Sequence, residues 1–276
     1  MTKTIGLALG GGAARGIAHV PLLEAIDELG VKPTKMAGTS IGALVGAVYA
    51  SGYSGREIRE HCCSVLGTRM EAAKRLFAHE EGSVFDLVNF SFRRPTQVDG
   101  MHLTKLAMPP NVVENIEDTK IDFAVTATDF YKREEITIKK GNLKSAVAAS
   151  IAIPGVIEAP EINGRFVIDG AMTNPVPFDH VCDGVDISIG IDVTGAQTQQ
   201  DENHKPGYTD LALGVSQIMQ YSITRLHLEK HRPDIYLAPP VNEFRAYDFF
   251  KVREILAAGD KVKDQFKRDL GALMEK

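Results

Sequence analysis

The sequence lacks the cysteine content of a disulfide-rich or zinc-binding protein. It has no tryptophan and only three cysteines, Cys62, Cys63 and Cys182, in 276 residues. An odd number of cysteines, two of them adjacent, does not make a disulfide framework, and no C-x-x-C pair is present to suggest a zinc site. We therefore expect reduced thiols, as in a cytoplasmic protein.

Long apolar runs are also missing. The N-terminal segment MTKTIGLALGGGAARG passes from a short apolar run into glycine, whereas a signal peptide needs a longer apolar core and a cleavage site. No stretch approaches the roughly 20 apolar residues of a transmembrane helix. We expect a cytoplasmic protein that does not span a membrane and contacts one at most peripherally.

An excess of positive charge is absent too. Lys and Arg number 31 against 36 Asp and Glu, which gives a formal net charge of −5. Binding to nucleic acid requires clustered Lys and Arg that neutralise phosphates. We therefore expect no nucleic-acid partner.

The apolar residues that are present alternate between strand-like and helix-like patterns. The first fifty residues predict a strand at 3–10, a helix from His19 to about residue 29, a strand at 34–38 and a helix at 40–51. This βαβα order predicts an α/β fold: a three-layer sandwich with a mostly parallel central sheet flanked by helices.

The remaining chain continues in the same way. Strands are predicted at 120–128, 136–139, 166–168, 186–193 and 234–237, and helices around 56–78 and at 143–150, 208–231 and 248–274. No repeat or linker interrupts the pattern, so we expect one domain over residues 1–276, with a C-terminal helical region at 208–276. The polar loop 194–207 is expected to be mobile. The aromatic stretch 82–98 has three interpretations: a lid, a membrane contact or part of the core.

The segment Gly38-Thr39-Ser40-Ile41-Gly42 matches the pattern G-x-S-x-G. In this pattern a sharp strand-to-helix turn exposes a serine hydroxyl, and the neighbouring positions must be small for the backbone to fold back. Alone the pattern is weak, because a serine that only caps a helix fits it as well. The apolar strand before Ser40 and the packed helix after it favour a nucleophile.

A second cluster, Gly10-Gly11-Gly12-Ala13-Ala14-Arg15-Gly16, also follows an apolar strand. Consecutive glycines can turn several backbone N–H groups toward one anion, a phosphate or an oxyanion. The cluster lacks the third glycine of the dinucleotide-binding fingerprint and the G-K-[ST] of a P-loop. A plain glycine-rich turn is the alternative interpretation.

Asp169 is the strongest candidate for a base. It follows the apolar run Phe166-Val167-Ile168 and precedes Gly170 and Ala171, at the end of a core strand where α/β active sites lie. An aspartate that only caps a turn is the alternative. None of the eight histidines has a comparable setting, so partial burial would have to raise the pKa of Asp169 for it to accept a proton from Ser40.

These motifs together resemble the patatin-like phospholipases, and within them the bacterial branch related to the catalytic domain of neuropathy target esterase. The resemblance rests on GGGAARG, GTSIG and Asp169-Gly170-Ala171 followed by NPVP, with a fourth similar stretch at 149–154, and covers residues 4–195. One departure is Pro21, where the branch usually has glycine two places after the histidine that matches His19.

The resemblance implies a lipid acyl hydrolase with a Ser-Asp dyad and no histidine, metal or cofactor. Carried onto this sequence, Ser40 is the nucleophile and Asp169 the base. The amides of Gly10, Gly11 and Gly12 form the oxyanion hole, and Arg15 helps to hold that loop. Gly38 and Gly42 form the elbow, and Gly170 and Ala171 follow the base.

Two other functions stay open at this point. The chain could be a catalytically weak scaffold or a regulatory binding protein that keeps the fold, although its intact motifs argue against this. A nucleotide-binding protein is the other alternative, and its fingerprints fail. The implied partner is a lipid ester substrate, with transient contact to a membrane surface. The C-terminal helices could also form a homo-oligomer interface.

Overall fold

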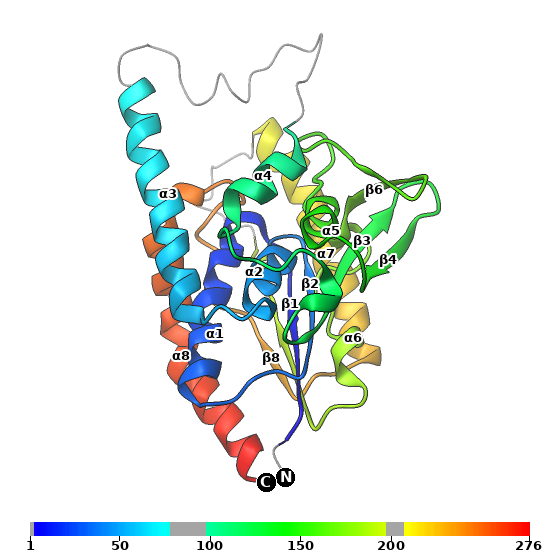
Figure 1. The fold of residues 1–276 in the computed structure, drawn as a ribbon. Helices are drawn as coiled ribbons and strands as arrows, with labels where there is room; N and C mark the ends of the chain where they lie inside the picture. The colour runs from blue at the N-terminus through cyan, green and yellow to red at the C-terminus, as the bar shows by residue number, and fades with distance from the viewer. Residues whose placement is uncertain (1–2, 78–97, 197–206) are drawn as a thin grey trace.

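The computed structural model describes residues 3–77, 98–196 and 207–276. Figure 1 shows a central sheet with helices on both sides. The strands are β1 (Ile5–Leu9), β2 (Lys35–Thr39), β3 (Asp122–Asp129), β4 (Glu134–Ile138), β5 (Glu161–Ile162), β6 (Arg165–Asp169), β7 (Ile187–Ile191) and β8 (Ile235–Leu237).

The helices connect these strands or follow them. The α-helices are α1 (His19–Glu28), α2 (Ile41–Ala50), α3 (Gly55–Phe77), α4 (Gly100–Ala107), α5 (Leu143–Ser150), α6 (Asp179–Cys182), α7 (Tyr208–Lys230) and α8 (Val252–Glu275). Short 3-10 turns are η1 (Ala13–Ala18), η3 (Ile116–Asp118), η4 (Gly170–Met172) and η5 (Phe249–Lys251).

The strand order in the sheet is β5-β6-β3-β2-β1-β7-β8, and β4 pairs with β3. The five central strands β3, β2, β1, β7 and β8 are parallel, whereas β4, β5 and β6 add antiparallel pairs at one side. Parallel strands present their carboxyl ends at the same edge, so the segments after β1, β2 and β3 meet there.

The two faces of the sheet differ in the size of their side chains. In β1, Leu7 and Leu9 belong to the main core with α1, α2 and α8, while Ala8 belongs to a smaller core with Phe178 and Val181. Successive residues of a strand point to opposite faces, so the alternation of leucine and alanine sets this division. The small face lets α6 approach closely: a Cβ on Gly6 would lie 2.2 Å from the Val181 carbonyl oxygen.

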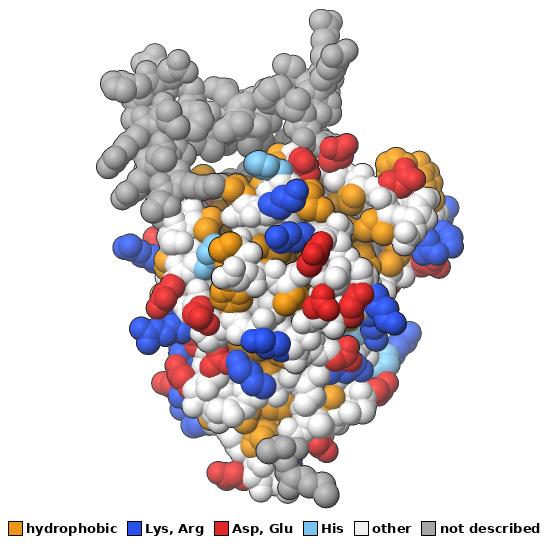
Figure 2. Space-filling model, viewed as in Figure 1, with side chains coloured by type: hydrophobic (Ala, Val, Ile, Leu, Met, Phe, Trp, Pro, Cys, Tyr) orange, Lys and Arg blue, Asp and Glu red, His pale blue; other side chains and the backbone are white. Residues whose placement is uncertain are grey.

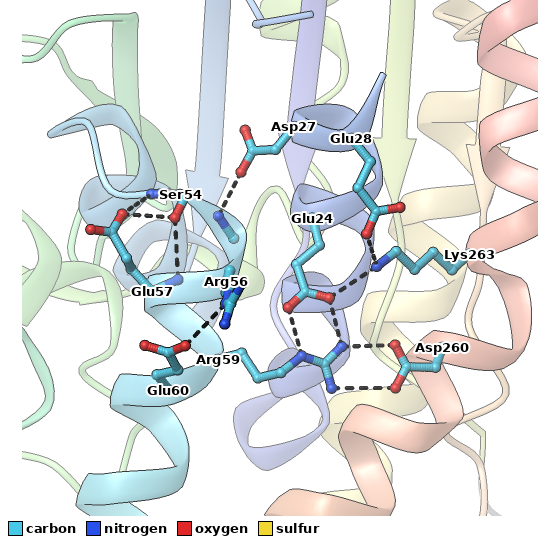
Figure 3. A network of polar contacts seen from close by, with 11 residues as sticks. Glu24, Asp27, Glu28, Ser54, Arg56, Glu57, Arg59, Glu60, Asp260 and Lys263 are labelled. Carbon is cyan, nitrogen blue, oxygen red and sulfur yellow. Dashed lines mark hydrogen bonds and ion pairs between the residues drawn. The ribbon is translucent and has the colours of Figure 1, made fainter. Parts of the chain in front are cut away.

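Charged side chains join α1, α3 and α8 outside the main core (Figure 3). Arg59 of α3 donates from Nε to Glu24 of α1 at 2.6 Å and from Nη2 to Asp260 of α8 at 2.7 Å. Lys263 of α8 contacts the other Glu24 oxygen at 3.1 Å and Glu28 at 2.6 Å. Glu24 is buried and shared by two cations, so this network links α1, α3 and α8.

The predicted fold class is confirmed: a mostly parallel sheet lies between helical layers. The structure also contains elements that the sequence patterns did not predict: the short strand β5, the 3-10 turns, and the short helices α4 and α6. The last predicted helix begins at Val252 instead of residue 248, because η5 precedes it. The aromatic stretch 82–98, apart from Val98, and most of the polar loop 194–207 lie outside the described residues.

Candidate active site

Ser40 lies on a sharp turn between β2, which ends at Thr39, and α2, which begins at Ile41. Its backbone has φ 54° and ψ −122°, a conformation that non-glycine residues rarely adopt. The flanking glycines are required by close packing. A Cβ on Gly42 would lie 2.1 Å from the carbonyl oxygen of Leu9, and one on Gly38 would lie 2.6 Å from the Cα of Ala43.

Ser150, the last residue of α5, supports the turn. The backbone N–H of Ser40 donates to the Ser150 Oγ at 2.7 Å, and Ser150 is fully buried. Sequence reasoning noted the stretch 149–154 only as a resemblance and assigned no role to Ser150. The N–H of a residue in a strained turn is not paired within a sheet or helix, so it needs another acceptor. A serine in a neighbouring buried segment, such as Ser150, can supply that acceptor.

Asp169, at the end of β6, lies directly against Ser40. The Ser40 Oγ donates to Asp169 Oδ2 at 2.7 Å, and the other carboxylate oxygen accepts the Ala171 N–H at 2.8 Å. Pairing of Ala127 with Asp169 sets the height of the carboxylate at the sheet edge. Gly170 is required here as well, because a Cβ would lie 2.4 Å from the Thr126 carbonyl oxygen.

Burial changes the acidity of Asp169. The residue is 3% exposed, and this desolvation raises the pKa of Asp169 to about 6, against the opposing effect of hydrogen bonds from the Ala171 amide and Ser40. Desolvation disfavours the charged carboxylate. A carboxyl with this pKa is ionised at neutral pH and is a better proton acceptor than an exposed aspartate.

Of the three loop glycines, Gly11 lies beside the serine. A Cβ on Gly11 would lie 3.3 Å from the Ser40 Cβ. However, the Gly10 N–H donates to the Ile191 carbonyl and the Gly11 N–H to the Pro175 carbonyl, each at 2.9 Å. The expectation that all three glycine amides are available for an oxyanion is therefore corrected: two of them already have acceptors.

Other amides near Ser40 can take that place. Within the described residues, the N–H groups of Gly12 and Ala13 have no backbone acceptor. Ala13 also has a positive φ of 51°, which turns the chain sharply after the glycines. The Ile41 N–H, in the first turn of α2, has no intrahelical acceptor. These three amides are the candidate oxyanion donors of the site.

Arg15 ties the glycine loop to distant parts of the chain. Its guanidinium is buried and donates from Nε to the Phe244 carbonyl at 2.7 Å and from Nη1 to the Thr194 carbonyl. The backbone N–H of Ala14 donates to the Ala246 carbonyl at 2.9 Å. These bonds support the predicted role of Arg15 in holding the loop.

No histidine in the described part of the chain hydrogen-bonds to Ser40 or Asp169. His19 is the nearest in the fold to the glycine loop, with its Nε2 2.9 Å from the Gly10 carbonyl oxygen. Burial lowers the pKa of His19 to about 4, so its imidazole is neutral at pH 7. His19 can orient the Gly10 carbonyl but does not act on the serine.

One group of described side chains has a spacing that could hold a metal ion: Glu135, Asp179 and His180. Their atoms already satisfy one another. Asn174 donates from Nδ2 to Glu135 at 3.0 Å and to Asp179 at 2.8 Å, and His180 Nε2 hydrogen-bonds to Glu135. This group borders the active site through Asn174, whose carbonyl accepts the Thr39 hydroxyl at 2.8 Å.

The site therefore combines a strained serine, a buried carboxylate in contact with its hydroxyl, and three candidate amide donors in the glycine loop and the first turn of α2. This arrangement can take a proton from the serine, form a bond to an electrophilic carbon and stabilise the resulting oxyanion. It is suited to acyl transfer.

The sequence matches known proteins along most of its length. The family model of the patatin-like phospholipases matches residues 7–181. An uncharacterized NTE family protein of Mycobacterium tuberculosis is 28% identical over 212 residues, covering 74% of this chain and 53% of the relative. A lysophospholipase NTE1 of Pyricularia oryzae is 25% identical over 301 residues, covering 98% of this chain and 19% of the relative.

The chain thus spans about half the length of the mycobacterial relative and about a fifth of the fungal one. Among solved structures, VipD of Legionella pneumophila aligns with a TM-score of 0.47 and 13% identity, over 97% of this chain and 67% of VipD. Within the described residues, none of the helices combines the length and the apolar character needed to cross a bilayer.

Proposed function

Because the chain belongs to the patatin-like phospholipase family, we propose that it is a lipid acyl hydrolase that uses a Ser40–Asp169 dyad. The observation that carries the proposal is the 2.7 Å hydrogen bond from Ser40 Oγ to the buried Asp169 carboxylate at a strained elbow. A serine that only capped α2 would accept a hydrogen bond from the first-turn amides, but the Ser40 side chain makes no such bond.

In the proposed reaction, Ser40 Oγ attacks the carbonyl carbon of a lipid ester while Asp169 takes the hydroxyl proton. The amides of Gly12, Ala13 and Ile41 stabilise the oxyanion. Asp169 then gives its proton to the leaving alcohol, and an acyl group stays on Ser40. Water attacks this acyl-enzyme with Asp169 again as the base, which releases the fatty acid and restores the serine.

The raised pKa of Asp169 suits both of its roles. A carboxyl near pKa 6 is ionised before attack, and it donates its proton more readily than an imidazolium with a higher pKa. Burial raises the pKa of Asp169, and the hydrogen bonds from Ala171 and Ser40 keep the carboxylate oriented. This scheme needs no metal ion.

The proposed substrate is a phospholipid or lysophospholipid ester. The support comes from the family description and from the fungal relatives, which are lysophospholipases. We also propose that residues 1–276 form one domain and that the protein contacts a membrane surface transiently.

Ester hydrolysis by purified protein tests the proposal. Ser40→Ala and Asp169→Asn should each abolish release of fatty acid from a panel of phospholipids, lysophospholipids and short-chain esters, with unchanged circular dichroism. Thr39→Ser, next to the nucleophile, is the matched control and should keep most of the activity. Undiminished hydrolysis by Ser40→Ala would exclude Ser40 as the nucleophile, and a wild-type protein inactive on the whole panel would favour a scaffold.

A further inference from the structure

The turn between β3 and β4 and the neighbouring strand β6 together carry a group of exposed aromatic side chains. Phe130, Tyr131 and Phe166 are 55%, 71% and 45% exposed. Their rings pack edge to face, with centroids 5.2 Å apart for Phe130–Tyr131 and 6.1 Å for Tyr131–Phe166. Contiguous apolar side chains at a protein surface mark sites that bind another protein, a membrane or a ligand.

The backbone of this turn is held in a defined shape. Asp129 Oδ1 accepts the N–H groups of Tyr131 at 3.1 Å and Lys132 at 2.9 Å, and the Phe130 N–H donates to the Phe166 carbonyl at 3.0 Å. Arg133 closes the turn with a φ of 59°. The aromatic side chains are thus presented by a rigid hairpin, so little ordering is needed before they bind.

Basic residues surround the aromatic rings. Lys132, Arg133 and Arg165 are all exposed. Arg165 lies 3.8 Å from the Asp129 carboxylate and Lys132 lies 3.7 Å from Glu134. Glu161, also exposed, is paired with Phe166 across β5 and β6, so the basic side chains lie among acidic ones. We call Phe130, Tyr131, Lys132, Arg133, Arg165 and Phe166 the hairpin patch. Figure 2 shows hydrophobic side chains gathered at the upper right, with acidic and basic side chains beside them.

The hairpin patch lies at the same edge of the sheet as Ser40. Thr126 of β3 is paired with Thr39, and Ala127 is paired with Asp169. Phe130 follows Thr126 by four positions, so it extends about 13 Å beyond it along the strand direction. Phe166 precedes Asp169 in the antiparallel strand β6. The patch therefore projects outward from the edge where the dyad lies.

A second exposed aromatic group lies near the glycine loop. Tyr247, Phe249 and Phe250 are 46%, 36% and 54% exposed. The segment that carries them is joined to the glycine loop by the bonds from Ala14 to Ala246 and from Arg15 to Phe244. Figure 1 shows the hairpin and η5 on opposite sides of the upper half of the molecule.

We propose that the hairpin patch is a membrane-contact surface that binds the headgroup region of an anionic phospholipid bilayer. The inference rests on the proposed function, because the substrate of a lipid hydrolase lies in such a surface. Aromatic side chains settle at the boundary between headgroups and acyl chains, and Lys and Arg bind anionic headgroups. With the hairpin patch on the bilayer, the edge of the sheet that holds Ser40 faces the lipid.

Vesicle partition tests this surface directly. The full chain is floated with vesicles of phosphatidylcholine, with and without phosphatidylserine. Two double variants are compared with it: Phe130→Ala with Tyr131→Ala, and Lys132→Glu with Arg133→Glu. Leu226→Ala on α7 and Lys261→Glu on α8 are the matched controls, because both residues are exposed and lie outside the patch.

We expect wild type to bind vesicles that contain phosphatidylserine. The variant Lys132→Glu with Arg133→Glu should bind them at least about 25-fold more weakly, because each basic residue contributes roughly a five-fold effect. The variant Phe130→Ala with Tyr131→Ala should also bind them more weakly. The controls should bind as wild type does. Hydrolysis of a short-chain water-soluble ester should be unchanged in both double variants, while hydrolysis of vesicle lipid falls with binding.

Unchanged vesicle binding in both double variants would overturn the proposal, and so would a wild type that does not bind. A concentration-dependent dimer that the aromatic double variant abolishes would also overturn it, because the patch would then join two copies of the chain. The soluble-ester assay keeps the two proposals apart. If the protein hydrolyses the soluble ester but the double variants bind vesicles as wild type does, only the membrane-contact proposal is refuted. If wild type does not hydrolyse the soluble ester, the proposed hydrolase function is refuted.

Discussion

Ser40 and Asp169 are 129 positions apart in the chain, yet the serine hydroxyl donates to the carboxylate at 2.7 Å. Both side chains are almost fully buried. The contact depends on two independent features: the strained turn after β2 that presents the hydroxyl, and the pairing of β6 with β3 that places the carboxylate at the same height.

The pKa of Asp169 predicts an acidic limit to activity. Its carboxyl has a pKa of about 6 in the fold, and only the ionised form can accept the serine proton. We therefore expect kcat/KM for a soluble ester to fall as the pH drops below about 6, with a slope of one proton. Initial rates across the pH range, at constant ionic strength, measure this limit.

His180→Gln is the control for that profile, because the pKa of His180 is also raised and its titration could be mistaken for that of Asp169. The acidic limit should persist in His180→Gln. A wild-type profile that stays flat to about one unit below the pKa of Asp169 would contradict its assignment as the base.

The same burial predicts that the wild-type carboxylate destabilises the fold. The folded pKa of Asp169, about 6, lies above the ordinary value of 3.8, so folding disfavours the charge at neutral pH. This loss of folding free energy is complete at pH values above the folded pKa of Asp169 and vanishes at pH values below its pKa in the unfolded chain. We expect Asp169→Asn to raise the free energy of unfolding at pH 8 by on the order of 2 kcal/mol.

Urea denaturation at pH 8 and again near pH 4 measures that difference, which should shrink at the lower pH. Asp122→Asn, at an exposed position at the start of β3, is the matched control and should change little. An Asp169→Asn variant less stable than wild type at pH 8 would mean that the bonds from Ser40 and Ala171 outweigh the desolvation of the carboxylate.

Ser150 is predicted to be a positioning residue. Ser150→Ala leaves the buried Ser40 N–H without its acceptor, and an unsatisfied buried donor costs about 1 to 3 kcal/mol. We expect a lower melting temperature and a lower kcat with little change in KM, because the elbow loosens while the exposed surface of the protein does not change. Ser145→Ala on the same helix removes only a bond to Asn142 and serves as the control. If Ser150→Ala and Ser145→Ala lower the melting temperature and kcat equally, Ser150 is not a positioning residue for Ser40.

The pair Glu135–His180 is expected to stabilise the fold most strongly within a limited range of pH. The hydrogen bond to Glu135 raises the pKa of His180 above its ordinary 6.5. Burial opposes the ionisation of Glu135, but the bond from His180 outweighs it and lowers the pKa of Glu135 below 4.5. The His180 contribution is complete below 6.5 and is lost as the pH rises through its folded pKa.

The Glu135 contribution is complete above 4.5 and is lost as the pH falls through its folded value. The free energy of unfolding lost in His180→Gln should therefore be largest between these two ordinary values and smaller at pH 9, as thermal or urea denaturation at a series of pH values would show. A loss that does not vary with pH would mean that His180 acts through packing and not through its charge.

Much of the fold could be predicted from local patterns. The helix expected to begin at His19 begins there, since Pro21 restricts the start to the first turn. The elbow at Ser40 was predicted because the glycines at 38 and 42 are needed by contacts within the turn and with β1. The helices α4 and α6 were missed because each is short and depends on tertiary contacts more than on periodicity.

The sequence does not predict which backbone N–H groups of the glycine loop are already hydrogen-bonded. Whether the Gly10 and Gly11 N–H groups are available depends on the carbonyls of Ile191 and Pro175, which lie more than 160 positions away. The bond from Ser40 to Ser150 is equally non-local. Motif spacing locates the glycine loop beside the serine, but tertiary pairing decides which of its amides can act on an oxyanion.

The most direct test of the account is to trap the serine. Wild-type protein is treated with a fluorophosphonate, and the modified peptide is identified by mass spectrometry, with Ser40→Ala and Asp169→Asn alongside. We predict one phosphonyl adduct, on Ser40, that is absent in Ser40→Ala and forms much more slowly in Asp169→Asn. An adduct on another residue, or a Ser40→Ala protein that still hydrolyses ester at the wild-type rate, would contradict the account.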